Sequence, residues 1–120
     1  MARVPVSGTN DEVMTTPATD VREVISGLDI DGMARVLQLT WLHIANEHAT
    51  QIMTVEVYDS DESTAVTAGT QRLVVMVPAQ DSVTLEWPEP GLRFVVNVTA
   101  AVTNGTCAAN GGISGGGYLV

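Results

Sequence analysis

Two histidines are the residues of this chain best suited to general acid–base chemistry or to binding a metal ion. His43 and His48 lie five positions apart, so a β-strand would place them on opposite faces. Neither histidine stands with a nucleophile in a recognisable catalytic motif. The sequence therefore predicts no catalytic residues and a protein that is not an enzyme.

Two acidic clusters offer oxygen ligands of the kind that Ca²⁺ prefers. Asp59, Asp61 and Glu62 occur together in "YDSDES", and Asp29 and Asp31 lie two positions apart in "DIDG". Neither cluster has the full spacing pattern of a calcium-binding loop. We interpret them as solvated turn residues, and we predict neither a metal site nor a cofactor.

The single cysteine, Cys107, excludes an internal disulfide and any metal site built from several thiolates. The nearby stretch "NGGISGGGYLV" lacks the lysine and the strand-to-helix context of a phosphate-binding loop. We interpret its glycines as a flexible tether before a final strand. That strand would pair either with its own sheet or with an exposed edge on a neighbouring subunit.

The two tryptophans suggest a stacking platform for a sugar, as in a carbohydrate-binding β-sandwich. Trp87 alternates in phase with Val83 and Leu85, which instead predicts a place in the core. For Trp41 we predict a contact with another subunit.

The charge balance argues against nucleic acid as a partner. The chain has 14 acidic residues against 5 arginines and no lysine, a formal net charge of −9. No basic patch is therefore expected to neutralise phosphates. No export signal or long apolar run appears either, so we expect a protein that is made in the cytoplasm and has no membrane partner.

The chain divides into an arm and a body. Residues 1–20 combine Thr, Pro, Asp, Asn and Gly with scattered Val, which predicts an extended N-terminal arm. Residues 21–120 contain short β-patterned runs that end at Gly, Pro, Asn or Asp. These features predict an all-β fold: a single antiparallel β-sandwich or jelly-roll-like domain. We expect deletion of the arm to leave the protomer folded and to weaken assembly.

The alternation of apolar and polar residues is clearest in two late runs, which "WPEPG" separates. The apolar positions predicted to face the core are Val83, Leu85 and Trp87 in the first run and Leu92, Phe94, Val96 and Val98 in the second.

The segment "GMARVLQLTWLHIANEHA" has apolar residues four apart, as a helix would, but its β-branched and aromatic content favours a strand. Both faces of that strand would be apolar, with Leu37, Leu39 and Trp41 opposite Val36, Leu42 and Ile44. We therefore expect the arm or a neighbouring subunit to cover one of the two faces.

The order of strands and turns resembles that of the small β-sandwich virion proteins of tailed bacteriophages over residues 36–120. The matching residues are Ile44–Asn46, Val55–Asp59, Val77–Ala79, Trp87-Pro88 and Gly91–Phe94. The resemblance implies a capsid decoration (cement) protein on the virion surface, which binds the major capsid protein as a homotrimer. A neck or tail component and a small carbohydrate-binding module remain alternatives.

We predict partner contacts at six residues, taken from the arm, the tryptophan and the last strand: Val4, Val6, Val13, Met14, Trp41 and Tyr118. A cluster of Trp and Tyr on one exposed face would favour the sugar-binding alternative, whereas a flat, dry patch of Val and Leu would favour assembly.

Overall fold

The structure, a computed structural model, describes residues 3–11, 22–26, 29–30, 33–34, 36–60, 71–102 and 111–120. All regular secondary structure in this part of the chain is β-strand. The strands are β1 (Val4–Asn10), β2 (Arg22–Ile25), β3 (Asp29–Ile30), β4 (Met33–Ala34), β5 (Leu37–Asn46), β6 (Met53–Asp59), β7 (Gln71–Val77), β8 (Asp81–Glu86), β9 (Leu92–Phe94), β10 (Val98–Val102) and β11 (Gly111–Leu119).

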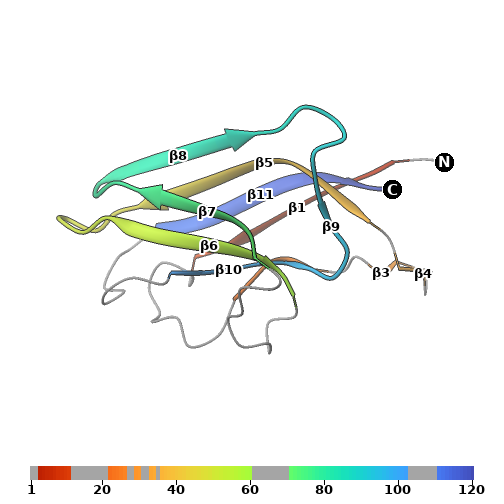
Figure 1. The fold of residues 1–120 in the computed structure, drawn as a ribbon, viewed down its shortest axis with the longest axis horizontal. Helices are drawn as coiled ribbons and strands as arrows, with labels where there is room; N and C mark the ends of the chain where they lie inside the picture. Colours follow the sequence, from red (N-terminus) through yellow and green to blue (C-terminus); the bar gives the residue numbers. More distant parts are fainter. Residues whose placement is uncertain are drawn as a thin grey trace.

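The strands form two antiparallel sheets, which face each other across a shared core (Figure 1). Sheet I has the order β1-β11-β5, and β8 and β9 lie one after the other along the far edge of β5. Sheet II has the order β2-β10-β6-β7, and β3 pairs with β4 separately. The predicted all-β antiparallel sandwich is confirmed.

The inner faces of the two sheets supply the core. On β8, Val83 and Leu85 pack against this core, and Trp87 just after the strand does the same. The positions between them, Thr84 and Glu86, are exposed. The predicted alternation of this strand and the core position of Trp87 are therefore confirmed. Each large apolar side chain that is fully buried in the core, such as Leu42 or Phe94, contributes about 1.5–3 kcal/mol to stability.

A β-bulge in β5 decides which of its residues face the core. Gly116 pairs with Trp41 and the next residue, Gly117, pairs with Leu39, so Thr40 is the extra residue. The bulge shifts the alternation by one position. The predicted division of this strand into two apolar faces is therefore wrong, because the four residues that lie buried in the core together are Leu37, Leu39, Leu42 and Ile44.

The second late run is not one strand. Strand β9 ends at Phe94 in sheet I, and the chain then crosses to sheet II, where β10 begins at Val98. Val96, which was predicted to face the core, is 40% exposed at this crossing. The carboxylate of Asp59 accepts hydrogen bonds from the backbone N–H groups of Val95 and Val96 at 3.0 and 2.8 Å, which holds the chain at the crossing.

The first half of the predicted arm belongs to the sandwich. Strand β1 pairs with β11 along its whole length, and Val4 and Val6 pack against the core. Gly8 lies so close to β2 that a Cβ atom added to it would stand 1.9 Å from the carbonyl oxygen of Val24. Alternation of Val with small polar residues is enough for an edge strand, a role that the turn-forming composition of this segment had hidden.

The glycine-rich segment near the C-terminus was predicted to be a flexible tether, but it forms strand β11. Its glycines lie inside a strand that runs between β1 and β5, so the C-terminal strand pairs with its own sheet (Figure 1). Ile113 and Leu119 are buried on its inner face. The glycines are retained in the strand because neighbouring groups come too close for a side chain: a Cβ atom at Gly117 would lie 2.0 Å from the carbonyl oxygen of Gln38.

Candidate functional site

The outer face of sheet I gathers aromatic and hydroxyl-bearing side chains. Because Ile113 and Leu119 point inward on β11, alternation places Ser114, Gly116 and Tyr118 on the outer side. The neighbouring strands add further polar outer residues by the same rule: Ser7 and Thr9 from β1, Trp41 and His43 from β5, and Ser82 and Thr84 from β8.

Trp41 lies against the backbone of β11 at the level of the bulge. A Cβ atom added to Gly116 would stand 2.5 Å from the indole Nε1 and 3.0 Å from Cζ2. The ring therefore fills the space that a side chain at this position would occupy. Trp41 keeps 37% of its surface exposed, so part of the indole remains open to solvent. Only glycine at position 116 allows this placement.

Tyr118 stands two residues beyond Gly116 on the same side of β11, about 6.7 Å along the strand. The guanidinium of Arg3 lies over its ring, 4.1 Å from the centroid, and also forms an ion pair with Glu89. Trp41 and Tyr118 thus lie on one outer face.

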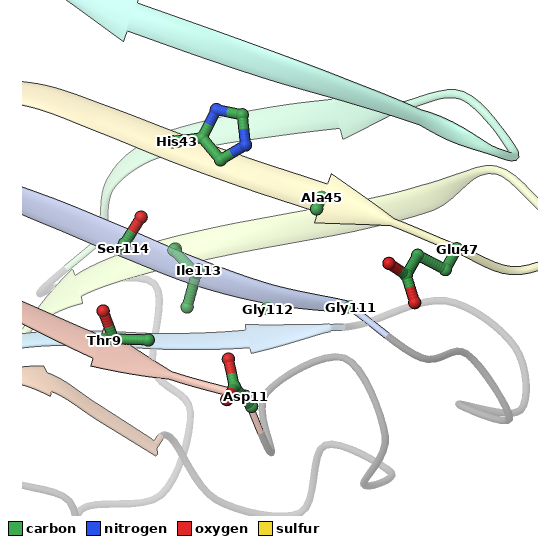
Figure 2. Close-up of a pocket in the computed structure, with 9 residues that line it drawn as sticks. All are labelled: Thr9, Asp11, His43, Ala45, Glu47, Gly111, Gly112, Ile113 and Ser114. Atoms are coloured by element: carbon green, nitrogen blue, oxygen red, sulfur yellow. The ribbon is translucent and has the colours of Figure 1, made fainter.

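A shallow trough continues this face toward the ends of β1 and β5. Its volume is about 600 Å³, and its floor is the backbone of Gly111 and Gly112 (Figure 2). The polar side chains that line it are Thr9, Asp11, His43, Glu47 and Ser114. A second depression of about 520 Å³ shares His43 and Glu47 with the trough and adds Asp81 and Ser82.

The trough does not contain a catalytic triad. His43 Nδ1 shares a 2.8 Å hydrogen bond with the hydroxyl of Thr84, at the position where a triad would have a carboxylate. Among the described residues, no hydrogen bond joins His43 to Ser114 or to an acidic side chain. The described residues also contain no group of three or more His, Cys, Asp or Glu side chains able to hold a metal ion.

His48 has a structural place instead. Its Nδ1 accepts hydrogen bonds from the backbone N–H groups of Thr50 and Gln51, at 3.1 and 2.9 Å. These bonds hold the turn between β5 and β6. Because that nitrogen acts as an acceptor, the imidazole is engaged with its own chain on this side.

Asn46 joins the two layers of the sandwich and is 1% exposed. Its side-chain Nδ2 donates to the carbonyl oxygens of Gln51, Val77 and Pro78, at 2.8, 3.1 and 3.2 Å. Its Oδ1 accepts from the backbone N–H of His48 at 3.0 Å. Asn46 and Val77 both belong to the motifs that carry the resemblance to phage virion proteins, so these motif residues act on the fold.

Tyr58 forms a second polar contact in sheet II. Burial, together with the carboxylate of Glu56 that accepts its hydroxyl hydrogen bond, raises the pKa of Tyr58 to about 12. The phenol therefore stays protonated and keeps donating to Glu56 at physiological pH.

The structure separates the six residues predicted to contact partners. Val4 and Val6 pack against the core of their own chain, and Trp41 and Tyr118 lie on the outer face of sheet I. Val13 and Met14 lie outside the described residues. Of the other predicted candidates, Asp59 binds backbone N–H groups, whereas Asp31, Asp61, Glu62 and Cys107 lie outside the described residues, as does the side chain of Asp29.

Sequence reasoning missed an apolar surface on the edge strand β7. Val75 and Val77 are buried, while Val74 and Met76 point away from the core and are 49% and 65% exposed. The signal was present, because "LVVMV" is apolar at consecutive positions and so must leave one apolar set outside. From the sequence, a second apolar face had instead been predicted on β5. The bulge in that strand turns its buried leucines and isoleucine to the same side, so no such second face forms there.

Comparison with protein-family models, curated proteins and solved structures gave no match for this chain. The described residues include no helix that is long and apolar enough to cross a membrane.

Proposed function

We propose that this protein is a non-enzymatic structural component of a tailed-phage virion, a decoration protein that binds the assembled capsid. The proposal is supported by the resemblance over residues 36–120 and by the role of its motif residues. Asn46 and Asp59 hold turns and crossings in place, which is what a rigid structural subunit requires.

The observation that carries the proposal is the apolar edge of sheet II. Strand β7 is the last strand of that sheet in the described part of the chain, so one side of its backbone has no strand partner there. Val74 and Met76 lie on this strand and face outward. An exposed sheet edge with apolar side chains is a surface that pairs with another protein chain.

The proposed partner at this edge is the major capsid protein, and the proposed oligomer is a homotrimer. Apolar contact and strand pairing together give a protein–protein interface its affinity, whereas the net charge of −9 keeps the rest of the surface solvated. The same fold in a neck or tail position would use the same edge, so location in the virion has to be measured.

The test is binding to capsids that lack this protein, assembled from the major capsid protein of the same phage. The double variant Val74→Ser/Met76→Ser is expected to bind more than tenfold more weakly and to melt at an unchanged temperature. The matched control is Val95→Ser/Val96→Ser, which removes two similarly exposed valines at the crossing between β9 and β10 and keeps the backbone bonds to Asp59.

Equal binding by the edge variant and the wild type would refute the assigned surface, and no binding by either would refute the decoration role. Immunogold labelling of intact virions separates head from neck and tail. Native mass spectrometry of the free protein tests the homotrimer directly.

A further inference from the structure

We propose that the outer face of sheet I binds a neutral glycan, with the Trp41 indole as the stacking platform and the adjoining trough as the hydrogen-bonding subsite. This inference does not rest on the virion role, because the capsid contact was assigned to the β7 edge of the other sheet. It holds for a decoration protein and equally for any other β-sandwich that carries this face.

The Trp41 ring lies on the outer surface of sheet I with part of the indole open to solvent. Gly116 leaves room for the indole to lie against the sheet, and 37% of the residue remains exposed. An aromatic face carries partial negative charge, and the C–H groups on one side of a pyranose ring carry partial positive charge. A ring that its own sheet holds in place loses little side-chain entropy when a sugar stacks on it.

Polar side chains lie beside that ring. His43 lies two residues from Trp41 on β5, and Ser114 lies two residues from Gly116 on β11, each about 6.7 Å along its strand. Asp11 and Glu47 stand at the far end of the trough (Figure 2). Sugar hydroxyls donate to carboxylates and accept from hydroxyl and imidazole groups, so this set matches a hydroxyl-rich ligand.

The charge of the trough selects the kind of glycan. Asp11, Glu47 and Asp81 line the two adjoining depressions, and no arginine is among the described residues that line either one. A sulfated, phosphorylated or uronic-acid glycan would meet like charge there. A neutral glycan has no charge for these carboxylates to repel, and its hydroxyl groups can donate hydrogen bonds to them.

The face also differs from a surface for a protein partner. Among the described residues, Trp41 on β5 and Val120 just after β11 are the strongly exposed large apolar side chains of this sheet, and the outer residues beside Trp41 are His43, Thr84, Glu86, Ser114 and Gly116. The centre of a protein–protein interface is usually apolar over a wider area. We therefore assign Trp41 to a glycan in place of the predicted subunit contact.

The experiment is affinity gel electrophoresis of the full chain in gels that contain hydroxyethylcellulose, laminarin, galactomannan or anionic alginate. We expect retardation by at least one neutral polysaccharide and none by alginate. Trp41→Ala should weaken that binding by more than tenfold, and Trp41→Phe, which keeps an aromatic ring, should retain part of it. Val74→Ser/Met76→Ser is the control and should bind the glycan as the wild type does.

Three results would overturn the inference: migration unaffected by all three neutral polysaccharides, equal retardation of Trp41→Ala and the wild type, or stronger retardation by alginate. Native mass spectrometry of Trp41→Ala covers the competing explanation. If the substitution dissociates an oligomer and no neutral polysaccharide binds the wild type, the platform is a contact between copies of this chain.

Discussion

The outer surfaces of the two sheets differ in the residues that they leave exposed. On sheet I the central strand β11 presents glycine and serine, so side chains from the neighbouring strand lean onto it and leave a polar trough. On sheet II the edge strand β7 presents Val74 and Met76 beside an open backbone. One protomer therefore offers a surface suited to a small polar ligand and another suited to a protein chain.

The difference shows that exposed apolar residues have to be interpreted together with the strand beside them. Trp41 and Met76 are both exposed, but the indole rests on the backbone at Gly116, whereas Met76 stands on a strand with a free edge. The first arrangement fixes a flat ring, and the second leaves a flexible side chain that adapts to a partner.

Removing β1 should have the largest effect, because this strand pairs with β11 in sheet I and also contacts β2 of sheet II. Deletion of residues 1–11 exposes the edge of β11 and the core beneath Val4 and Val6, so we expect a loss of about 4–6 kcal/mol in the free energy of unfolding. This expectation reverses the one made from composition, that the arm could be removed without harm.

Urea denaturation of the truncated protein measures that loss. Gly8→Val tests the same strand by a single change, because its Cβ would clash with the carbonyl oxygen of Val24. Ser7→Val, on the exposed side of β1, is the matched control and should be close to neutral. If the truncated protein were as stable as the wild type, β1 would not contribute to the stability of the sandwich and would be a separate arm, as the sequence predicted.

The shared core should respond next. Phe94 is fully buried and pairs with Leu37 in sheet I, so Phe94→Ala should cost about 3–5 kcal/mol. Glu86→Ala, on the exposed side of β8, should be nearly silent in the isolated protein. Chemical denaturation of both variants compares the inner and outer sides of one sheet edge. If Glu86→Ala were the more harmful change, the register of this edge would be wrong.

Removing the Asn46 hydrogen bonds that link the two sheets should have an intermediate effect on the free energy of unfolding. Asn46→Ala removes a buried amide that bonds the turn after β5 and the end of β7, and we expect a loss of about 2–3 kcal/mol. Asn46→Asp keeps the acceptor for His48 but turns a carboxylate oxygen toward three carbonyl oxygens. It should be at least as destabilising as alanine. Thermal unfolding ranks the two, and a more stable Asp variant would contradict the assigned role of the Nδ2 group.

The smallest expected effect belongs to Tyr58 in sheet II. Its pKa is raised from 10.0 to about 12 in the folded protein, so the folded state binds the phenol proton more tightly than the unfolded state does. This contribution to the free energy of unfolding is fully present below pH 10 and is lost as the pH rises through 12. Urea unfolding at about pH 9 and 11.5 should show a fall in stability for the wild type that is smaller in Tyr58→Phe. Because the chain has no lysine, few other groups titrate in this window. Equal falls in both proteins would remove Tyr58 as the cause.

Much of the fold was predictable because a β-strand has a local sequence signal, the alternation of apolar and polar residues between turn-forming residues. The inward side of β8 was correctly assigned from Val83 and Leu85, and Trp87 was correctly placed in the core by phase alone. The prediction failed where a strand changed phase or sheet, at Thr40 and after Phe94. Of the candidate site, Trp41 and Tyr118 were named from the sequence, but the trough between β1 and β5 was not.

The sequence by itself determined the class of fold, the approximate positions of most strands and the acidic character of the protein, because alternation, turn residues and charge are properties of neighbouring positions. The tertiary structure alone decided that Trp41 points outward, that β1 joins the sheet and that Asn46 ties two distant turns together. Each of these depends on residues far away in the chain, such as Gly116, Val24 and Val77. A β-sheet brings such residues together by pairing strands, and no local pattern records which strands will pair.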